Sequence, residues 1–257
     1  MFLKKIKESR ILKGLIYMIV GIITYPGINL LNRLRISGME NLDELPKTNV
    51  LFVSNHQTYF ADVITFIHIF CAQFHGRRNR LGIPFYLLWP FTRIKYVAAE
   101  ETMKSTLLTR FFSLAGALTV KRTWTDGNKA VRRGLDPSDT RKIFDALHHN
   151  WVITFPQGTT KAYAPGRKGT AYIIRQTNPI VIPVVINGFS RAFNKKGLVL
   201  KRKGTALSVR FKAPLQLDLN QTNDEIMDVI MDAIEQSKKF MPAHRTVPAE
   251  TRAAMPA

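Results

Sequence analysis

The sequence predicts an α/β fold in which helices flank a central, mostly buried mixed sheet. Short apolar runs rich in β-branched residues alternate along the chain with stretches of helical periodicity, which is typical of a sheet covered by helices. The chain has 257 residues, of which 46% are hydrophobic, and this composition can fill a sizeable core. We therefore expect one large domain with a small N-terminal addition.

The N-terminal addition, residues 1–34, is predicted to be a membrane-anchoring helical hairpin. Residues 15–31 carry no charge, and Pro26-Gly27 interrupts them. The run is marginal for a span, because crossing a bilayer takes about 20 apolar residues. We expect a helix pair that dips into one leaflet as a monotopic or single anchor, and a buried core helix is the alternative. The basic residues that precede the run are Lys4, Lys5, Lys7, Arg10 and Lys13.

Basic residues on both sides of this run also predict the cellular location. Arg33 and Arg35 follow it where a secretory signal would have a small-residue cleavage site, so we expect the segment to stay uncleaved. Lys and Arg at both ends would contact anionic headgroups and hold the rest of the chain on the cytoplasmic face. The expected location is therefore the inner membrane, with its phospholipid surface as a partner.

The main domain is expected over residues 35–240, and residues 241–257 are expected to form a flexible tail. Apolar β-rich runs predict strands, and helical periodicity predicts four helices, the last of which opens with Thr222 and Glu225 in capping-box spacing. The predicted strands are 49–56, 95–99, 117–122, 151–158, 180–188 and 206–215. The predicted helices are 61–74, 103–116, 138–150 and about 223–239.

The charge balance favours anionic partners. The chain has 38 Lys and Arg against 18 Asp and Glu, a formal charge of +20, which suits nucleic acid, phospholipid headgroups or phosphorylated cofactors. We find no RNA- or DNA-binding motif, and an anionic bilayer already accounts for the charge, so no nucleic acid partner is expected. Cys71 is the only cysteine, and His148-His149 have no partner acid at metal-ligand spacing. We therefore predict no disulfide and no metal site.

A candidate catalytic pair lies in "SNHQTYFADV", residues 54–63. His56 ends a predicted strand, and Asp62 is the nearest acid, at the start of the next helix. A neutral imidazole can take a proton from a substrate hydroxyl if a carboxylate holds its other ring nitrogen. On composition alone, a polar loop remains equally compatible with this stretch. Ser54 lacks the Gly-x-Ser-x-Gly elbow of a serine nucleophile, and Cys71 lies in an apolar helix where a thiol is inert.

Two further stretches are candidate anion sites. In "GALTVKRTW", Lys121 and Arg122 end a strand, and Arg122 has the planar fork that suits a phosphate. In "FPQGTTKAYAPGRKG", a strand enters a Pro- and Gly-punctuated loop with Lys161 and Arg167. Such a loop allows the backbone to approach an anion closely. A solvated strand end is the alternative for the Lys121-Arg122 pair.

The order of these stretches resembles the lysophospholipid (1-acylglycerol-3-phosphate) acyltransferase family. Four blocks match in order and spacing, "NHQTYFAD", "GALTVKR", "FPQGTT" and "VIPVVI", over roughly residues 35 to 215. The resemblance implies an O-acyltransferase that moves a fatty acyl group from acyl-CoA or acyl-carrier protein to a lipid hydroxyl at the membrane. It implies no metal and no cofactor beyond the acyl donor.

The resemblance also implies roles for individual residues. His56 takes the position of the general base, and Asp62 that of its orienting carboxylate. Arg122 falls on the arginine thought to bind the acceptor phosphate. Gln157, Gly158 and Thr159 fall in the third block, and Pro183 in the fourth. We expect Lys121, Arg122, Gln157, Gly158, Thr159, Lys161 and Arg167 to form the phosphate site.

Three departures from the family pattern affect these expectations. His56 and Asp62 are separated by five residues where four are usual, so the loop or a π-bulge must absorb one residue. Gln157 replaces a glutamate, and Thr160 replaces a common arginine. We expect 1-acylglycerol-3-phosphate as acceptor, giving phosphatidic acid. A lyso-aminolipid such as lyso-ornithine or lyso-glycine lipid is the alternative, and a non-catalytic basic membrane- or nucleic-acid-binding protein is the rival from another class.

Overall fold

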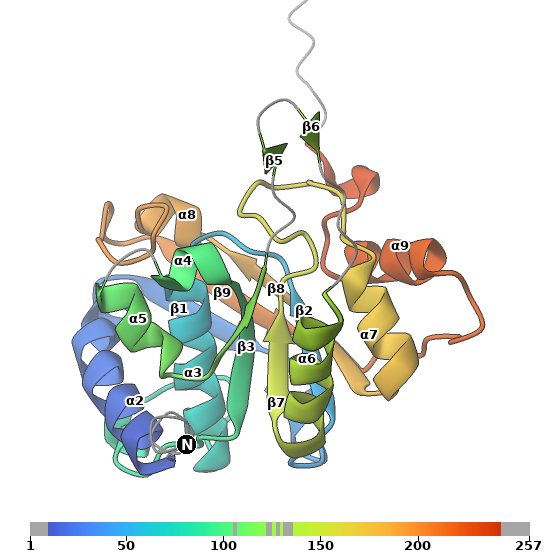
Figure 1. Cartoon of the computed structure of the whole chain (residues 1–257). Helices are drawn as coiled ribbons and strands as arrows, with labels where there is room; N and C mark the ends of the chain where they lie inside the picture. The colour runs from blue at the N-terminus through green and yellow to red at the C-terminus, as the bar shows by residue number, and fades with distance from the viewer. Residues whose placement is uncertain (1–9, 105–106, 122–124, 127–128, 131–135, 243–257) are drawn as a thin grey trace, which may run out of the picture.

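A mixed sheet forms the centre of the protein, as the sequence predicts. The computed structural model describes residues 10–104, 107–121, 125–126, 129–130 and 136–242 (Figure 1). Seven strands of these residues form one sheet in the order β1-β9-β8-β2-β7-β3-β4. Strands β1 and β9 are parallel to each other, and β9 is antiparallel to β8, while the other pairs are parallel. The strands are β1 (Arg33–Ser37), β2 (Val50–Ser54), β3 (Ile94–Ala99), β4 (Ala117–Val120), β7 (Trp151–Thr154), β8 (Ile180–Asn187) and β9 (Ala206–Phe211).

Helices cover both faces of this sheet. The larger apolar core lies under α2, α3, α4 and α5, and the smaller one under α6, α7 and α9 (Figure 1). Successive residues of β2 serve opposite faces, since Phe52 belongs to the first core and Leu51 and Val53 to the second. The helices are α2 (Arg10–Tyr25), α3 (Ala61–Phe74), α4 (Glu100–Lys104), α5 (Leu107–Ser113), α6 (Pro137–His149), α7 (Gly169–Thr177), α8 (Phe189–Ala192) and α9 (Asn223–Ala233).

Short elements complete the described part of the chain. A two-stranded ribbon forms from β5 (Thr125–Asp126) and β6 (Lys129–Ala130). Three 3-10 turns lie at Met39–Leu42, Pro84–Leu87 and Lys238–Phe240, and a π-helical turn lies at Pro26–Leu30. Residues 1–9 of the predicted anchor and residues 243–257 of the predicted tail lie outside the described residues.

The predicted elements are largely confirmed. Each predicted strand overlaps an observed one, and the helix predicted over 61–74 is α3. The helix predicted over 103–116 differs, because α4 ends at Lys104 and α5 begins at Leu107. β1 and α7 were not predicted. β1 carries Arg33 and Arg35 and depends on pairing with β9, which lies about 170 residues further along the chain.

The N-terminal segment differs from the predicted helix pair. Pro26-Gly27 does not separate two helices, because a π-helical turn over Pro26–Leu30 continues α2, and Arg10–Leu30 forms a single apolar helix of 21 residues. The π-helical turn, in which the Leu31 N–H donates to the Pro26 carbonyl at 2.8 Å, accommodates a proline that has no N–H to donate. This is the one helix of the described residues long and apolar enough to cross a membrane. Within α2, Ile16, Tyr17 and Gly21 are buried against the domain.

Candidate active site

The sheet topology gathers the three candidate loops at one edge. Because β2, β7, β8, β3 and β4 run in the same direction, their carboxyl ends meet there, and sites commonly form at this edge. His56 follows β2, Phe155 follows β7 and Lys121 follows β4. The three loops singled out in the sequence therefore lie at the same end of the sheet.

His56 and Asp62 form the predicted hydrogen bond. Nδ1 of His56 lies 2.9 Å from Oδ2 of Asp62, whose side chain is fully buried. The same carboxylate accepts bonds from the Gln57 N–H at 2.6 Å, the Thr58 N–H at 3.0 Å and the Thr58 hydroxyl at 2.7 Å. With Nδ1 donating to the carboxylate, Nε2 of the neutral imidazole is left as a proton acceptor. This arrangement suits a general base.

The loop before α3 absorbs the additional residue between His56 and Asp62. α3 is a regular α-helix from Ala61, so no π-bulge is involved. The Tyr59 and Phe60 N–H groups donate to the carbonyls of Lys195 and Lys196 at 3.1 and 3.0 Å. A distant turn thus holds the loop in shape.

Gly197 brings this turn against the loop between His56 and α3. Its φ is +76°, and a Cβ there would lie 2.5 Å from the Ala61 nitrogen and 2.7 Å from the Thr58 hydroxyl oxygen. No other residue fits at that distance without moving Thr58, which bonds Asp62. The sequence offers no signal for this contact, because the two segments lie far apart along the chain.

Two amides, which the sequence analysis did not single out, fix the loop on its other side. Asn55 donates to the carbonyl of Ile186 at 2.9 Å and accepts from its N–H at 2.8 Å. Gln57 accepts from the Phe189 N–H at 2.9 Å. His56 is thus flanked by two side chains bound to the end of β8 and the start of α8. Their position on either side of His56 was the available signal, because most side-chain hydrogen bonds are made to backbone or water.

The third block contacts His56 directly. The ring of Phe155 stacks on the imidazole with a centroid distance of 3.9 Å and an interplanar angle of 22°. Gly158 has φ +61°, and a Cβ there would lie 2.7 Å from Nε of Arg167. The Arg167 side chain therefore lies against the glycine of the block. The backbone N–H of Arg167 donates to the Pro156 carbonyl at 2.9 Å. These contacts bring a guanidinium to the loop that touches His56.

Gln157 does not take the place expected of a phosphate ligand. Its side chain is 3% exposed, and its amide nitrogen donates to the Ala164 carbonyl at 2.9 Å and to Oε1 of Gln236 at 3.2 Å. Gln236 in turn accepts from the Tyr163 N–H at 2.9 Å. The side chain therefore ties the loop to the segment after α9. The Gln157 side chain is buried because the loop folds back over it, and the local sequence does not reveal this fold.

The remaining predicted phosphate ligands lie in different settings. The Lys121 N–H donates to Asp139 at 2.8 Å, and its ammonium lies 3.7 Å from a carboxylate oxygen of Asp136. The Thr159 hydroxyl accepts from the Lys161 N–H at 3.3 Å, and the Lys161 side chain is exposed. Arg122 lies outside the described residues. Within the described ranges no group of three or more His, Cys, Asp or Glu side chains is placed to hold a metal.

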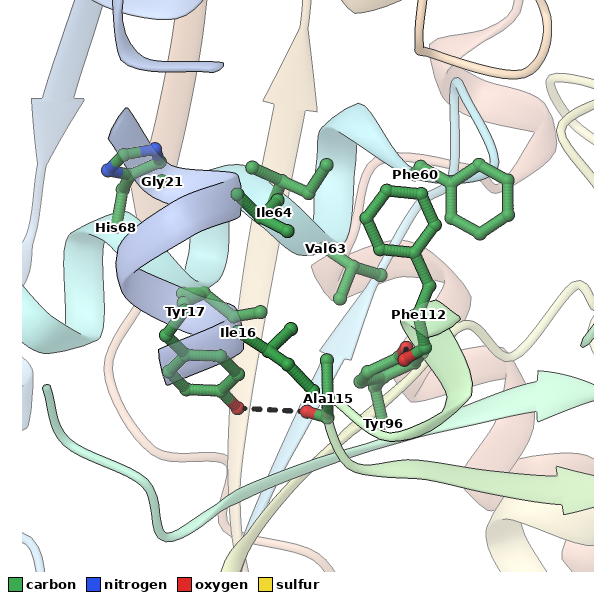
Figure 2. Close-up of a pocket in the computed structure, with 12 residues that line it drawn as sticks. Ile16, Tyr17, Gly21, Phe60, Val63, Ile64, His68, Tyr96, Phe112 and Ala115 are labelled. Atoms are coloured by element: carbon green, nitrogen blue, oxygen red, sulfur yellow. Dashed lines mark hydrogen bonds between the residues drawn. The ribbon is translucent and has the colours of Figure 1, made fainter. Parts of the chain in front are cut away.

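An apolar pocket begins beside the loop between His56 and α3, at Phe60. It lies between α2, α3, α5 and β3, and Figure 2 shows Phe60 and His68 on opposite sides of it. The Tyr17 hydroxyl donates to the Ala115 carbonyl at 3.1 Å within this lining (Figure 2). The free volume is about 20 Å³, room for roughly one water molecule. An acyl chain therefore does not fit unless side chains move.

Comparisons with known proteins identify a family over this region. The family model described as Acyltransferase matches residues 33–187, more than half of the chain. The crystal structure of the 1-acyl-sn-glycerophosphate (LPA) acyltransferase, PlsC, from Thermotoga maritima is similar at 17% identity and a TM-score of 0.46, covering 89% of this chain and 76% of that one. No curated protein matches the sequence.

Proposed function

The chain belongs to the acyltransferase family, and we propose that it transfers a fatty acyl group from acyl-CoA or acyl-carrier protein to the hydroxyl of a lysophospholipid. The observation that carries the proposal is the 2.9 Å hydrogen bond between His56 and Asp62 inside the matched region. It leaves one imidazole nitrogen able to accept the hydroxyl proton.

The proposed reaction proceeds by direct attack. Nε2 of His56 takes the proton of the acceptor hydroxyl as its oxygen attacks the thioester carbonyl carbon, and Asp62 stabilises the imidazolium that forms. The tetrahedral intermediate then breaks its C–S bond, and the imidazolium returns the proton to the leaving thiolate. An ester and a free thiol result, so atoms and charge balance without a metal.

Direct attack is favoured because the two nucleophile candidates considered in the sequence, Ser54 and Cys71, are occupied or inert. The Ser54 hydroxyl is fully buried and donates to the Asn55 carbonyl at 2.9 Å. Burial raises the pKa of the Cys71 thiol to about 12, so it stays protonated at neutral pH. A covalent acyl-enzyme on either side chain would need a rearrangement of the core.

We propose 1-acylglycerol-3-phosphate as the acceptor, giving phosphatidic acid. Arg167 beside Gly158 supports this choice, because a guanidinium binds phosphate with a planar fork. Lys161 and Lys121 would add charge, together with Arg122. The alternative acceptor, a lyso-aminolipid, rested on Gln157 and Thr160. Since Gln157 is buried within the loop, the alternative now depends on Thr160 alone.

We also propose that the protein works on the cytoplasmic face of the inner membrane. The apolar helix over Arg10–Leu30 supports membrane association by its length and composition. The acyl chain of the proposed lysophospholipid acceptor resides in a bilayer, so an enzyme held at the bilayer surface meets the acceptor there.

An acyl-transfer assay tests the proposal. The purified protein is given acyl-CoA or acyl-carrier protein together with lysophosphatidic acid, lysophosphatidylcholine or lyso-ornithine lipid, and products are identified by mass spectrometry. We expect phosphatidic acid as the main product. Transfer to lyso-ornithine lipid alone would favour the alternative acceptor, and no thioester consumption with any pair would contradict the proposed function.

A further inference from the structure

A second apolar segment, far from the N-terminal helix in sequence, lies along it in the structure. At one end the Tyr25 hydroxyl donates to the Gly82 carbonyl, and at the other end the Lys13 ammonium donates to the Thr92 carbonyl at 2.6 Å. Between them, a Cβ at Gly21 would lie 2.7 Å from Leu87. Residues 82–92 therefore run antiparallel to α2 over most of its length.

Four large apolar side chains of this segment are exposed, and three others are buried. Tyr86 and Leu87 are 2% and 1% exposed, and they fix the 3-10 turn Pro84–Leu87 to the core. Phe91 is buried as well, whereas Phe85 and Trp89 point outward and are 65% and 74% exposed. Ile83 and Leu88 are exposed as well. We call these four residues, Ile83, Phe85, Leu88 and Trp89, the aromatic ridge.

The aromatic ridge lies beside the exposed stripe of α2. That stripe consists of Ile11, Leu15, Ile19, Ile22 and Ile23. The two glycines that face the segment, Gly14 and Gly21, directly precede two residues of the stripe, and one residue turns an α-helix by about 100°. The stripe therefore begins about a quarter turn of the helix from the side that packs on residues 82–92. Together the ridge and the stripe expose nine large apolar side chains, and exposed apolar side chains gathered in this way mark an interaction site.

The charges around this surface indicate an anionic bilayer as its partner. Residues 63–99 contain no Asp or Glu but include Arg77, Arg78, Arg80, Arg93 and Lys95. Residues 10–39 contain no acid either. Anionic headgroups attract such basic flanks, and tryptophan is enriched where the hydrocarbon of a bilayer meets its headgroups. A second protein copy would bring the same positive charge against it.

We propose that the aromatic ridge is a second membrane-contact element, which inserts Phe85 and Trp89 into an anionic phospholipid surface beside α2. The inference rests on the membrane location in the proposed function and adds a partner surface outside the N-terminal segment. Because Lys13 and Tyr25 bind residues 82–92, the ridge and α2 would meet the bilayer as one unit.

Vesicle flotation of the full-length protein tests the proposal. Phosphatidylcholine vesicles are used with and without phosphatidylglycerol, and the variant carries Phe85→Ser and Trp89→Ser. The control carries Tyr172→Ser and Val229→Ser, which remove an aromatic and an aliphatic side chain, 40% and 39% exposed, from the opposite face of the sheet. We expect the ridge variant to bind anionic vesicles at least roughly tenfold more weakly and the control to match the wild type.

Two further measurements separate this proposal from the proposed function. Activity with substrates dispersed in detergent micelles should be retained in the ridge variant, while activity with vesicle-borne substrate falls. Brominated lipids should quench the wild-type tryptophan emission, and Trp89→Phe should remove that quenching while binding persists.

The proposal is overturned if the ridge variant binds anionic vesicles as the wild type does, or if Trp89 emission is not quenched. It is also overturned if the variant changes self-association and leaves vesicle binding intact, since the ridge would then join two copies. An inactive wild-type protein that still binds vesicles through the ridge would contradict the proposed function and leave this inference standing.

Discussion

Nδ1 of His56 lies 2.9 Å from Oδ2 of Asp62, and three donors from the intervening loop bind the same buried carboxylate. The carboxylate is therefore held in one orientation before any substrate arrives. A preorganised acceptor of this kind holds the imidazole in one tautomer and stabilises its protonated form during proton transfer. The dyad depends on the loop as much as on the two side chains.

Replacing the carboxylate should lower turnover more than binding. In the wild type, N–H and O–H donors of the loop bind the Asp62 carboxylate. In Asp62→Asn these donors face the N–H groups of an amide, and the imidazole loses the carboxylate that fixes its tautomer. We expect kcat to fall by roughly 10²- to 10⁴-fold with KM little changed. Steady-state kinetics measure this, and a variant with an unchanged kcat would contradict the role of Asp62.

Variants of two buried threonines distinguish a loss of activity through the His56–Asp62 pair from a general loss of stability. The Thr58 hydroxyl donates to Asp62 at 2.7 Å, and the Thr65 hydroxyl donates to the Ala61 carbonyl at 2.8 Å. Thr58→Val should lower kcat by roughly tenfold, because one charge-assisted bond to the carboxylate is lost. Thr65→Val should lose similar stability and keep its kcat. Equal kcat values in the two variants would argue against the loop as part of the dyad.

Restoring the family's glutamate at position 157 should weaken the protein. The buried amide nitrogen of Gln157 donates to the Ala164 carbonyl oxygen and to Oε1 of Gln236. An ionised carboxylate has no hydrogen to donate to these two acceptors. We expect Gln157→Glu to lose about 1–3 kcal/mol of unfolding free energy, measured by urea denaturation. Exposed Gln176→Glu on α7 is the control. A stable Gln157→Glu protein with tighter binding of the phosphate acceptor would show that position 157 is a ligand.

Filling the gap at Gly197 should impair catalysis. A methyl group there meets Ala61 and Thr58, and thereby displaces the loop that binds Asp62. Gly204 has a similar φ of +69° with no atom within 4 Å of its Cβ position, so Gly204→Ala carries the backbone strain alone. We expect Gly197→Ala to lose at least roughly tenfold in kcat and Gly204→Ala to retain it. Comparable activity in both would refute the bracing role of the turn.

His68 should make stability depend on pH. The ring is buried between the hydroxyls of Thr24 and Tyr86, at 3.2 and 3.0 Å, and burial lowers the pKa of His68 to about 4 from an ordinary 6.5. The unfolded chain therefore binds the proton first as the pH falls. Stability is full above pH 6.5 and declines by about 3 kcal/mol towards pH 4.

Unfolding of a His68→Gln variant checks this. Its stability should vary less between pH 6.5 and 4 than that of the wild type, while His75→Gln, at an exposed position, should retain the wild-type dependence. A parallel pH profile in the wild type and the His68→Gln variant would mean that His68 is not buried as a neutral ring.

The sequence predicted the site where local signals were sufficient. His56 and Asp62 are six positions apart, and their pairing depends on one loop, so the family resemblance of the four sequence blocks was enough to predict it. The structure adds contacts made across the fold. Gly197 meets the loop from a turn about 140 residues away, and Gln157 binds Gln236 after the last long helix. Such partners cannot be inferred from a local pattern.

The same distinction holds for the fold. Buried strands such as β2 are continuous apolar runs and were predicted closely, because both faces of a parallel sheet are covered. β1 was missed because it carries Arg33 and Arg35 and needs β9 as its partner. The break expected at Pro26-Gly27 did not form, since a π-helical turn absorbs the proline. At this position, the packing of the helix on the domain outweighs the tendency of Pro-Gly to end a helix.

His56→Ala tests the central claim most directly. Initial rates of acyl transfer to lysophosphatidic acid are measured for the variant and the wild type at equal folded concentration, with thermal unfolding as the check on the fold. The proposed mechanism predicts a loss of roughly 10²- to 10⁴-fold in kcat with an unchanged unfolding temperature. A folded His56→Ala protein that transfers acyl groups at the wild-type rate would contradict the assignment of His56 as the general base.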